Sequence, residues 1–182
     1  MRIARLIRDI PEESIKAGNK ITNLRQLIQN DAKVNGWACQ CIRCREAGHQ
    51  LYDIETPKLN TLVMPALGGT EYFISFDSPN KKVLYAFTRL RINNSDVKQF
   101  IPELRGAGLI RELHTYGEVT AMGQKGDVQH SGFGRKLLTE AETICREQGL
   151  KKIAVIAGIG VRTYYQKMGY SLQGTYMVKN LK

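Results

Sequence analysis

The sequence lacks any apolar run long enough to cross a membrane. Its opening stretch, MRIARLIRDIPEE, alternates charged and aliphatic residues where a secretory signal needs an unbroken apolar segment. Internal repeats and low-complexity tracts are also absent. Acidic residues are in short supply, because 17 Asp and Glu face 27 Lys and Arg and leave a net charge of +10. We therefore expect a cytoplasmic protein without membrane contact that attracts nucleic acid or phosphorylated cofactors; a basic surface without such a partner fits the composition equally well.

Three of the four cysteines lie close together, which is poor spacing for a disulfide framework. Three lie in CQCIRC, a spacing typical of reduced, metal-binding thiols: Cys39, Cys41 and Cys44, with His49 as a candidate fourth ligand. Zinc is the favoured ion, because a thiolate-rich site would stabilise a segment too small to fold by burial alone. An iron–sulfur cluster, unligated thiols, and a water or a residue from elsewhere as fourth ligand stay open as alternatives. Cys145 is expected in the core.

Hydrophobic periodicity divides the chain into an arm, residues 1–50, and a main domain, residues 51–182. The arm is predicted to be a mostly helical connector. Apolar residues recur in it at helical spacing before a glycine that should end the helix: Ile21, Leu24, Leu27 and Ile28, then Gly36. This apolar face needs a partner surface.

In the main domain the hydrophobic pattern changes from helical spacing to the alternation of apolar and polar residues that is typical of strands. The β-rich runs YFISF and VLYAFTRLRI flank the turn sequence DSPNKK, which predicts an antiparallel hairpin over residues 72–92. Single strands are predicted within residues 109–119, 152–158 and 170–181, and helices from residue 133 and within residues 161–170. An antiparallel sheet with one strand–helix–strand crossover indicates an α/β fold with a mixed sheet and a helix packed on it.

The stretch QHSGFGRKLL places two glycines at the start of the predicted helix. The first amides of a helix have no intrahelical acceptors and the helix dipole favours negative charge, so Gly132 and Gly134 would let a phosphate approach the backbone. The spacing Gln-x-x-Gly-x-Gly matches neither the dinucleotide-binding Gly-x-Gly-x-x-Gly nor the P-loop. Taken alone, the turn is also compatible with an ordinary helix start and two incidental glycines.

Several linked motifs, in order, carry a family resemblance: IRELHTYGEV, QHSGFGRKLLTEAE, KIAVIAGIGVRTYYQKMGY and LQGTYMVKNL. They closely resemble the C-terminal acetyltransferase domain of the Elongator catalytic subunits, the family of tRNA wobble-uridine acetyltransferases. IRDIP and CQCIRCREAGH resemble the linker leading into that domain, which is also thought to bind zinc. The resemblance covers nearly the whole chain. It implies a GNAT acetyl-CoA-binding fold in residues 51–182 behind a helical, metal-binding linker in residues 1–50, with acetyl-CoA and tRNA as partners.

The resemblance also assigns residues to the acetyl-CoA site. The amides of Phe133, Gly134 and Arg135 would bind the pyrophosphate, with Gln129 and Gly132 in the same turn. The backbone of a splayed strand would pair with the pantetheine arm: Glu112, Leu113, His114 and Thr115.

Tyr165 matches the tyrosine near the thioester, and Tyr164 and His114 are the other catalytic candidates. A positioned phenol could protonate a departing thiolate. Adjacent helical residues point in different directions, so at most one tyrosine should face the cofactor. Read from the residues alone, both tyrosines could instead be packing residues and His114 a structural histidine.

The radical S-adenosylmethionine part of the family has no counterpart in this sequence. The resemblance implies that acetyl-CoA supplies a two-carbon unit, which ends as a carboxymethyl group on the wobble uridine. We expect this chain to bind acetyl-CoA and part of the tRNA, with the radical part supplied by another domain or other Elongator-type subunits, or lost. A basic set could follow the phosphate backbone: Lys81, Lys82, Arg89, Arg91, Lys98, Arg105 and Arg111.

Two other functions stay open on the sequence alone. The first is N-acetylation of a lysine or a small amine, with Glu112 or Glu118 as the base. The second is a non-catalytic module that senses acetyl-CoA or docks a partner through the arm.

Overall fold

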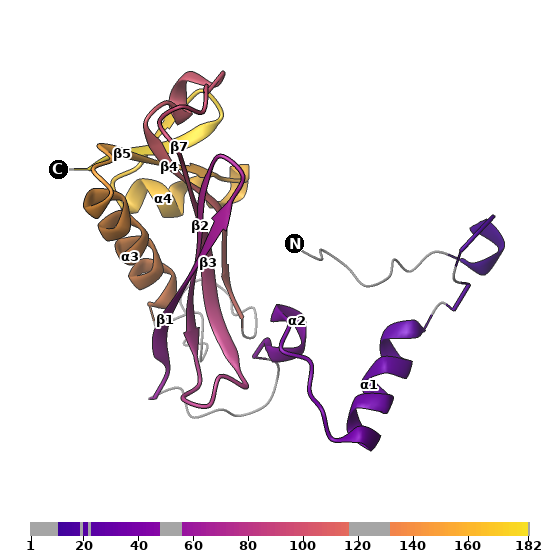
Figure 1. Cartoon of the computed structure of the whole chain (residues 1–182). Coiled ribbons are helices and arrows are strands. Elements are labelled where there is room, and N and C mark those ends of the chain that lie inside the picture. Colours follow the sequence, from indigo (N-terminus) through magenta and orange to yellow (C-terminus); the bar gives the residue numbers. More distant parts are fainter. Residues whose placement is uncertain (1–10, 19, 22, 48–55, 117–131, 182) are drawn as a thin grey trace. The chain divides into compact units, whose positions relative to one another are not determined.

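The computed structural model describes residues 11–18, 20, 21, 23–47, 56–116 and 132–181 (Figure 1). The chain forms two compact units, Met1–Cys44 and Arg45–Lys182. None of the helices in the described residues combines the length and apolarity needed to cross a membrane.

The first unit is helical in its described part. It holds the short 3-10 turn η1 (Glu12–Ser14), the helix α1 (Leu24–Asn35) and most of α2 (Ile42–Arg45). Helix α1 ends where the sequence predicts, because Gly36 adopts a left-handed conformation (φ 71°) and donates its N–H to Ala32 O. Ala32 is the one buried apolar residue among the described residues of this unit, so burial contributes little to its stability.

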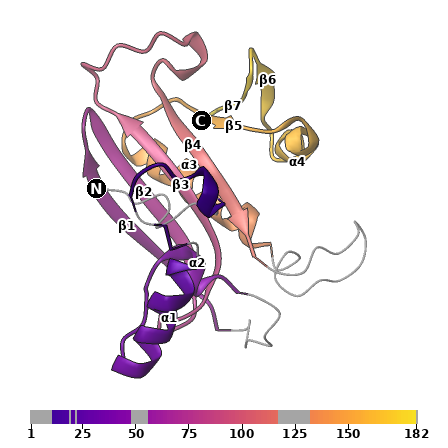
Figure 2. The ribbon, with the colours of Figure 1, turned by 90° about the vertical axis from the view of Figure 1, so that its right-hand side faces the viewer.

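The second unit is built on a seven-stranded sheet in the order β1-β2-β3-β4-β5-β7-β6 (Figures 1 and 2). Its strands are β1 (Lys58–Ala66), β2 (Gly69–Asp77), β3 (Leu84–Asn93), β4 (Ala107–Thr115), β5 (Lys152–Ile156), β6 (Ser171–Gln173) and β7 (Tyr176–Asn180). All neighbouring strands are antiparallel except β4 and β5, which are parallel. The predicted mixed sheet and the hairpin over residues 72–92 are confirmed.

Helix α3 (Phe133–Glu147) packs on one face of this sheet and leads into β5. It buries the face that its sequence makes apolar: Phe133, Leu137, Leu138, Ala141, Ile144 and Cys145. The Cys145 thiol sits directly over Gly108 of β4, where any side chain would collide with it. The remaining short elements are η2 (Pro102–Leu104), η3 (Ile159–Val161) and α4 (Arg162–Lys167).

Two features differ from the sequence expectations. The single strand expected over residues 170–181 is wrong, because the chain reverses at Gly174 (φ 54°) and forms the two strands β6 and β7. Strand β1 was not predicted at all. Most of its side chains are exposed on both faces at the edge of the sheet, so neither burial nor alternation marks it in the sequence.

Candidate functional site

The two parallel strands separate partway along β4. They pair from Ala107 and Lys152 to Ile110 and Val155, after which β5 ends at Ile156 while β4 continues to Thr115. Beyond Ile110, the described residues therefore place no strand beside the β5-facing edge of β4. The predicted cofactor residues 112–115 lie on this open stretch.

A β-bulge lies where the open stretch begins. Arg89 of β3 pairs with Glu112 and Leu90 pairs with Ile110, which leaves Arg111 as the extra residue of β4. Such a bulge bends the strand and increases its twist. The bulge thus accounts for the departure of β4 from β5.

Within the described residues, the first turn of α3 has backbone donors without a hydrogen-bond partner. Gly132 occupies the N-cap position in a left-handed conformation (φ 70°) and offers no side-chain cap. The first helical hydrogen bond runs from Lys136 N–H to Gly132 O at 3.1 Å. The N–H groups of Phe133, Gly134 and Arg135 precede it and have no intrahelical acceptor, which is the arrangement that binds anions.

Three elements meet at Gly134. A Cβ atom added there would lie 2.7 Å from the Tyr164 hydroxyl on α4 and 3.9 Å from Thr115 Cγ2 at the end of β4. The structure thus brings together one residue from each of the predicted glycine turn, splayed strand and tyrosine helix. Gln129, also expected in this turn, lies outside the described residues.

The two adjacent tyrosines have different surroundings. The Tyr164 hydroxyl lies against Gly134, whereas Tyr165 is 6% exposed and packs edge-on between Tyr164 (5.3 Å between ring centroids) and Tyr170 (5.8 Å). Burial raises the pKa of Tyr164, an effect that the nearby Arg135 cation opposes. Burial, together with Tyr164, raises the pKa of Tyr165 to about 12. Both phenols therefore stay protonated at neutral pH and can act as hydrogen-bond donors.

His114 and Glu112 direct their side chains differently from Leu113 and Thr115. Side chains alternate along a strand, so His114 and Glu112 lie on the sheet face away from α3. The exposed His114 ring stacks on Phe87 (6.0 Å) and contacts Tyr116 (4.5 Å). The backbone of His114 belongs to the open stretch of β4, but its ring does not share a sheet face with Thr115 and α3.

The same face carries an ion cluster centred on Glu71. This carboxylate accepts from Arg89 at 3.1 Å and from Arg111 at 2.6 Å, and Arg89 also lies 3.6 Å from Glu112. Burial of Glu71 works to raise its pKa, but the two arginines outweigh burial and hold the pKa below its ordinary value. Glu112 is thus paired with a buried cation, which makes it a poor candidate for a free base.

Four of the seven basic residues singled out in the sequence are engaged within the fold. Besides Arg89 and Arg111, Arg91 donates to Leu67 O at 2.6 Å and Arg105 donates to Gln99 O at 3.2 Å. These arginines hold strands and loops together, which a count of charges cannot show. A phosphate track stays a prediction for the remaining lysines: Lys81, Lys82 and Lys98.

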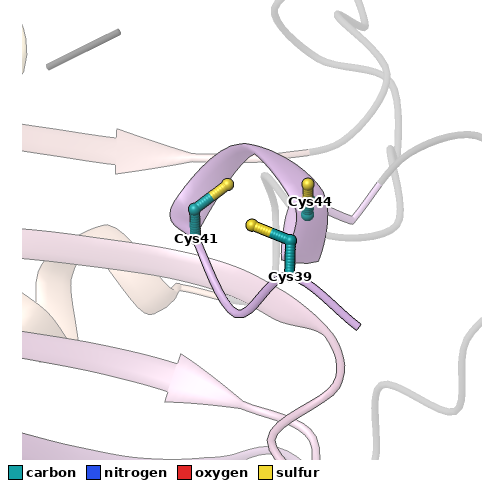
Figure 3. A group of neighbouring side chains, drawn as sticks. All are labelled: Cys39, Cys41 and Cys44. Carbon is teal, nitrogen blue, oxygen red and sulfur yellow. The ribbon is translucent and has the colours of Figure 1, made fainter. Parts of the chain in front are cut away.

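The clustered cysteines lie in the first unit (Figure 3). The sulfur atoms of Cys39, Cys41 and Cys44 are all within 4.8 Å of one another, and those of Cys39 and Cys41 point toward each other. Helix α1 supplies two donors to Cys44 Sγ, from Arg25 Nη2 at 3.4 Å and Gln29 Nε2 at 3.9 Å. These donors were not predicted, because nothing in the local sequence links α1 to the cysteines. His49, the predicted fourth ligand, lies outside the described residues.

Comparison with known proteins agrees with this geometry. The model of the acetyltransferase (GNAT) family matches residues 71–170. The whole chain is 42% identical to 40% of the tRNA uridine(34) acetyltransferase of Dehalococcoides mccartyi (strain CBDB1), and 41% identical to 34% of the Elongator complex protein 3 of Homo sapiens. In the solved structure of archaeal Methanocaldococcus infernus Elp3 with an N-terminal deletion, 43% of that chain superposes on 96% of this one, with a TM-score of 0.80 and 43% identity. The chain therefore spans less than half the length of these relatives.

Proposed function

Because this chain belongs to the acetyltransferase (GNAT) family, we propose that it binds acetyl-CoA where β4 and β5 separate. The observation that carries the proposal is the open stretch of β4 beside the uncapped first turn of α3. The pyrophosphate would accept hydrogen bonds from the amides of Phe133, Gly134 and Arg135, helped by the helix dipole and the Arg135 cation. Gly132 and Gln129 would complete this turn.

The pantetheine arm would take the place of a missing strand. The backbone N–H and C=O groups of residues 112–115 can pair with its amide groups, as a sheet edge pairs with an added peptide. His114 would take part through its backbone, and we assign no catalytic step to its ring. The acetyl thioester would then lie near the tyrosine pair.

The tyrosine pair supplies the proposed acid. A phenol of Tyr164 or Tyr165 would donate a hydrogen bond to the thioester sulfur and protonate it as the C–S bond breaks, which gives a gain of about 10²–10⁴-fold for a positioned acid. Tyr164 contacts the proposed pyrophosphate turn, while Tyr165 lies deeper, toward Tyr170. Replacing each by phenylalanine would separate their roles.

We further propose that the acceptor is the wobble uridine of a tRNA. This rests on the names of the relatives, which include tRNA uridine(34) acetyltransferases, and on the net charge of +10. The family resemblance implies that carboxymethyluridine formation also needs a radical S-adenosylmethionine component. Another domain or an Elongator-type partner would supply this component.

The cysteine cluster is proposed as a structural zinc site. Sulfur atoms on a tetrahedral zinc are roughly 3.8 Å apart, given Zn–S distances of about 2.3 Å, so thiols already within 4.8 Å need only a small adjustment. A bound zinc would cross-link Cys39, Cys41 and Cys44, with His49 as the proposed fourth ligand. The N–H groups of Arg25 and Gln29 would then orient Cys44 and join α1 to the site. Reduced thiols of this kind also support a cytoplasmic location.

The proposed function is tested by release of free CoA thiol from acetyl-CoA, measured with and without tRNA at low and at moderate salt. We expect release that needs tRNA and falls steeply as salt rises, because phosphate contacts are lost to competing counterions. Binding of acetyl-CoA is measured in parallel by calorimetry. Release with a lysine or polyamine and no tRNA would instead show a conventional N-acetyltransferase, and tight binding without any turnover would show a sensing module or a missing radical component.

A further inference from the structure

A buried carboxylate on α3 binds donors from two other parts of the second unit. Glu142 is 6% exposed; both of its oxygens lie 2.8 Å from Lys179 Nζ on β7, and one accepts the Tyr170 hydroxyl at 3.0 Å. Arg146, one turn further along α3, lies 3.5 Å away. The side chains of Lys179 and Arg146 are 27% and 41% exposed. Ion pairs that reach the solvent, like buried ones, add little net stability, so stability alone does not account for the cluster. We call Glu142, Tyr170 and Lys179 the Glu142 cluster.

The Glu142 cluster is joined to the tyrosine pair through the end of α4. Gly169 (φ 85°) turns the chain there, and the Tyr170 N–H donates to Tyr165 O at 3.1 Å. The three rings then pack edge to face in series: Tyr170 on Tyr165 at an interplanar angle of 69°, and Tyr165 on Tyr164 at 82°. A continuous row of contacts therefore runs from Glu142 to Tyr164.

The row ends back on α3. The Tyr164 hydroxyl lies against Gly134, in the first turn of the helix that carries Glu142 about two turns later. Helix α4 has only six residues, too few to hold a conformation without tertiary contacts. Besides its packing on η3, β6 and β7, it is held by contacts at Gly134 and at the Glu142 cluster.

We propose that the Glu142 cluster is a positioning device for the tyrosine pair. It fixes α4 against α3 so that a phenol meets the thioester end of bound acetyl-CoA, and its own three residues lie outside the proposed pyrophosphate turn. None of its three residues touches the ligand. The assignment rests on the proposed acetyl-CoA site, and it predicts that the cluster acts on the acetyl end of the ligand alone.

The test compares the dissociation constants of acetyl-CoA and CoA. Both ligands carry the same pyrophosphate and pantetheine, so the ratio of the two dissociation constants depends only on contacts with the thioester end. Tyr170→Phe removes one hydroxyl and keeps the ring, and Lys179→Met keeps most of the stem. The matched control is Tyr176→Phe on β7, a tyrosine outside the cluster.

We expect Tyr170→Phe to change the ratio by about fivefold, the usual effect of one hydrogen bond, with the CoA constant unchanged. Lys179→Met should act in the same direction, and Tyr176→Phe should change nothing. Tyr164→Phe and Tyr165→Phe show which phenol sets the ratio, and adding Tyr170→Phe to that variant should change the ratio no further, because both act through one group.

Three results would overturn the positioning role. The first is a lower melting temperature for Tyr170→Phe with an unchanged ratio, which would make the cluster purely structural. The second is an additive effect of Tyr170→Phe and the tyrosine substitution, Tyr164→Phe or Tyr165→Phe, that sets the ratio. The third is an equal loss of affinity for both ligands. If the unsubstituted protein bound neither acetyl-CoA nor CoA, the proposed function itself would be refuted, and the positioning role with it.

Discussion

Replacing Gly134 by alanine perturbs the point where the proposed pyrophosphate turn, β4 and α4 meet. The backbone of Gly134 is helical, and alanine is favoured over glycine in a helix by up to about 1 kcal/mol, so the change alone would stabilise the first turn of α3. The new Cβ, however, would lie 2.7 Å from the Tyr164 hydroxyl, which must move away. The two effects oppose each other, and we expect a small net change in melting temperature.

Acetyl-CoA binding should respond much more strongly than stability. In the proposed site the new Cβ would hold the pyrophosphate away from the Gly134 amide, and losing one charge-assisted hydrogen bond costs about 1.5–3 kcal/mol, or roughly 10- to 100-fold in dissociation constant. Calorimetric titration of acetyl-CoA into the Gly134→Ala protein measures this loss. Unchanged affinity would show that the first turn of α3 is not the phosphate site.

The Tyr164 contact is checked by a double-mutant cycle. Tyr164→Phe removes the hydroxyl oxygen, and ring atom Cζ of residue 164 is then the nearest of its atoms to the new Cβ, at 3.6 Å. This is an ordinary contact, so in the Tyr164→Phe background Gly134→Ala should raise the melting temperature. Gly132→Ala is the matched control, because its cost of about 1–2 kcal/mol comes from a left-handed φ and should be equal in both backgrounds. Equal effects of Gly134→Ala in both backgrounds would refute the contact between Tyr164 and Gly134.

Three further predictions concern the arm, the tyrosines and the ion cluster. Adding a chelator should lower the helical far-UV circular dichroism of the native protein and release one zinc per chain, whereas Cys41→Ser should bind no zinc and Cys145→Ser should bind it normally. The folded pKa of Tyr165 lies above its unfolded value, so its contribution to stability is full below pH 10 and is lost as the pH rises toward 12; urea unfolding at pH 9 and pH 11 should show a smaller drop for Tyr165→Phe than for the native protein. Glu71→Gln should lower the free energy of unfolding by about 1–3 kcal/mol because it removes the nearer of the two carboxylates that pair with buried Arg89, while the exposed Glu147→Gln should be neutral.

The elements that could be predicted from the sequence are those whose hydrophobic pattern has a different period from the patterns of the neighbouring segments. The hairpin over residues 72–92 and helix α3 have an apolar face of clear period, and both are confirmed. The strands β6 and β7 were merged because a two-residue turn at Gly174 interrupts the apolar pattern too briefly to show. An exposed edge strand such as β1 has no buried face for a pattern to reveal.

The features of the candidate site also differ in how far the sequence predicts them. The glycines before α3 mark the start of the helix within one short segment, so the position of its first turn could be predicted from the sequence; phosphate binding there stays a prediction. The contact between Tyr164 and Gly134, the pairing of Arg89 with Glu71, and the Glu142 cluster join residues from separate strands and helices. Contacts of that kind depend on the packing of elements, and no spacing within one segment encodes them.

The separation of β4 from β5 also affects how firmly the two parts of the sheet are held together. Strands β1 to β4 form one half and β5 to β7 the other; the ladder between β4 and β5 has four residue pairs, all on the side away from Thr115, and helix α3 packs across both halves. A pantetheine arm lying in the gap would act as a temporary eighth strand and brace the halves against each other. The sheet would then become more rigid as the concentration of acetyl-CoA rises. Hydrogen exchange at the backbone of β4 would measure this change, because it would become slower.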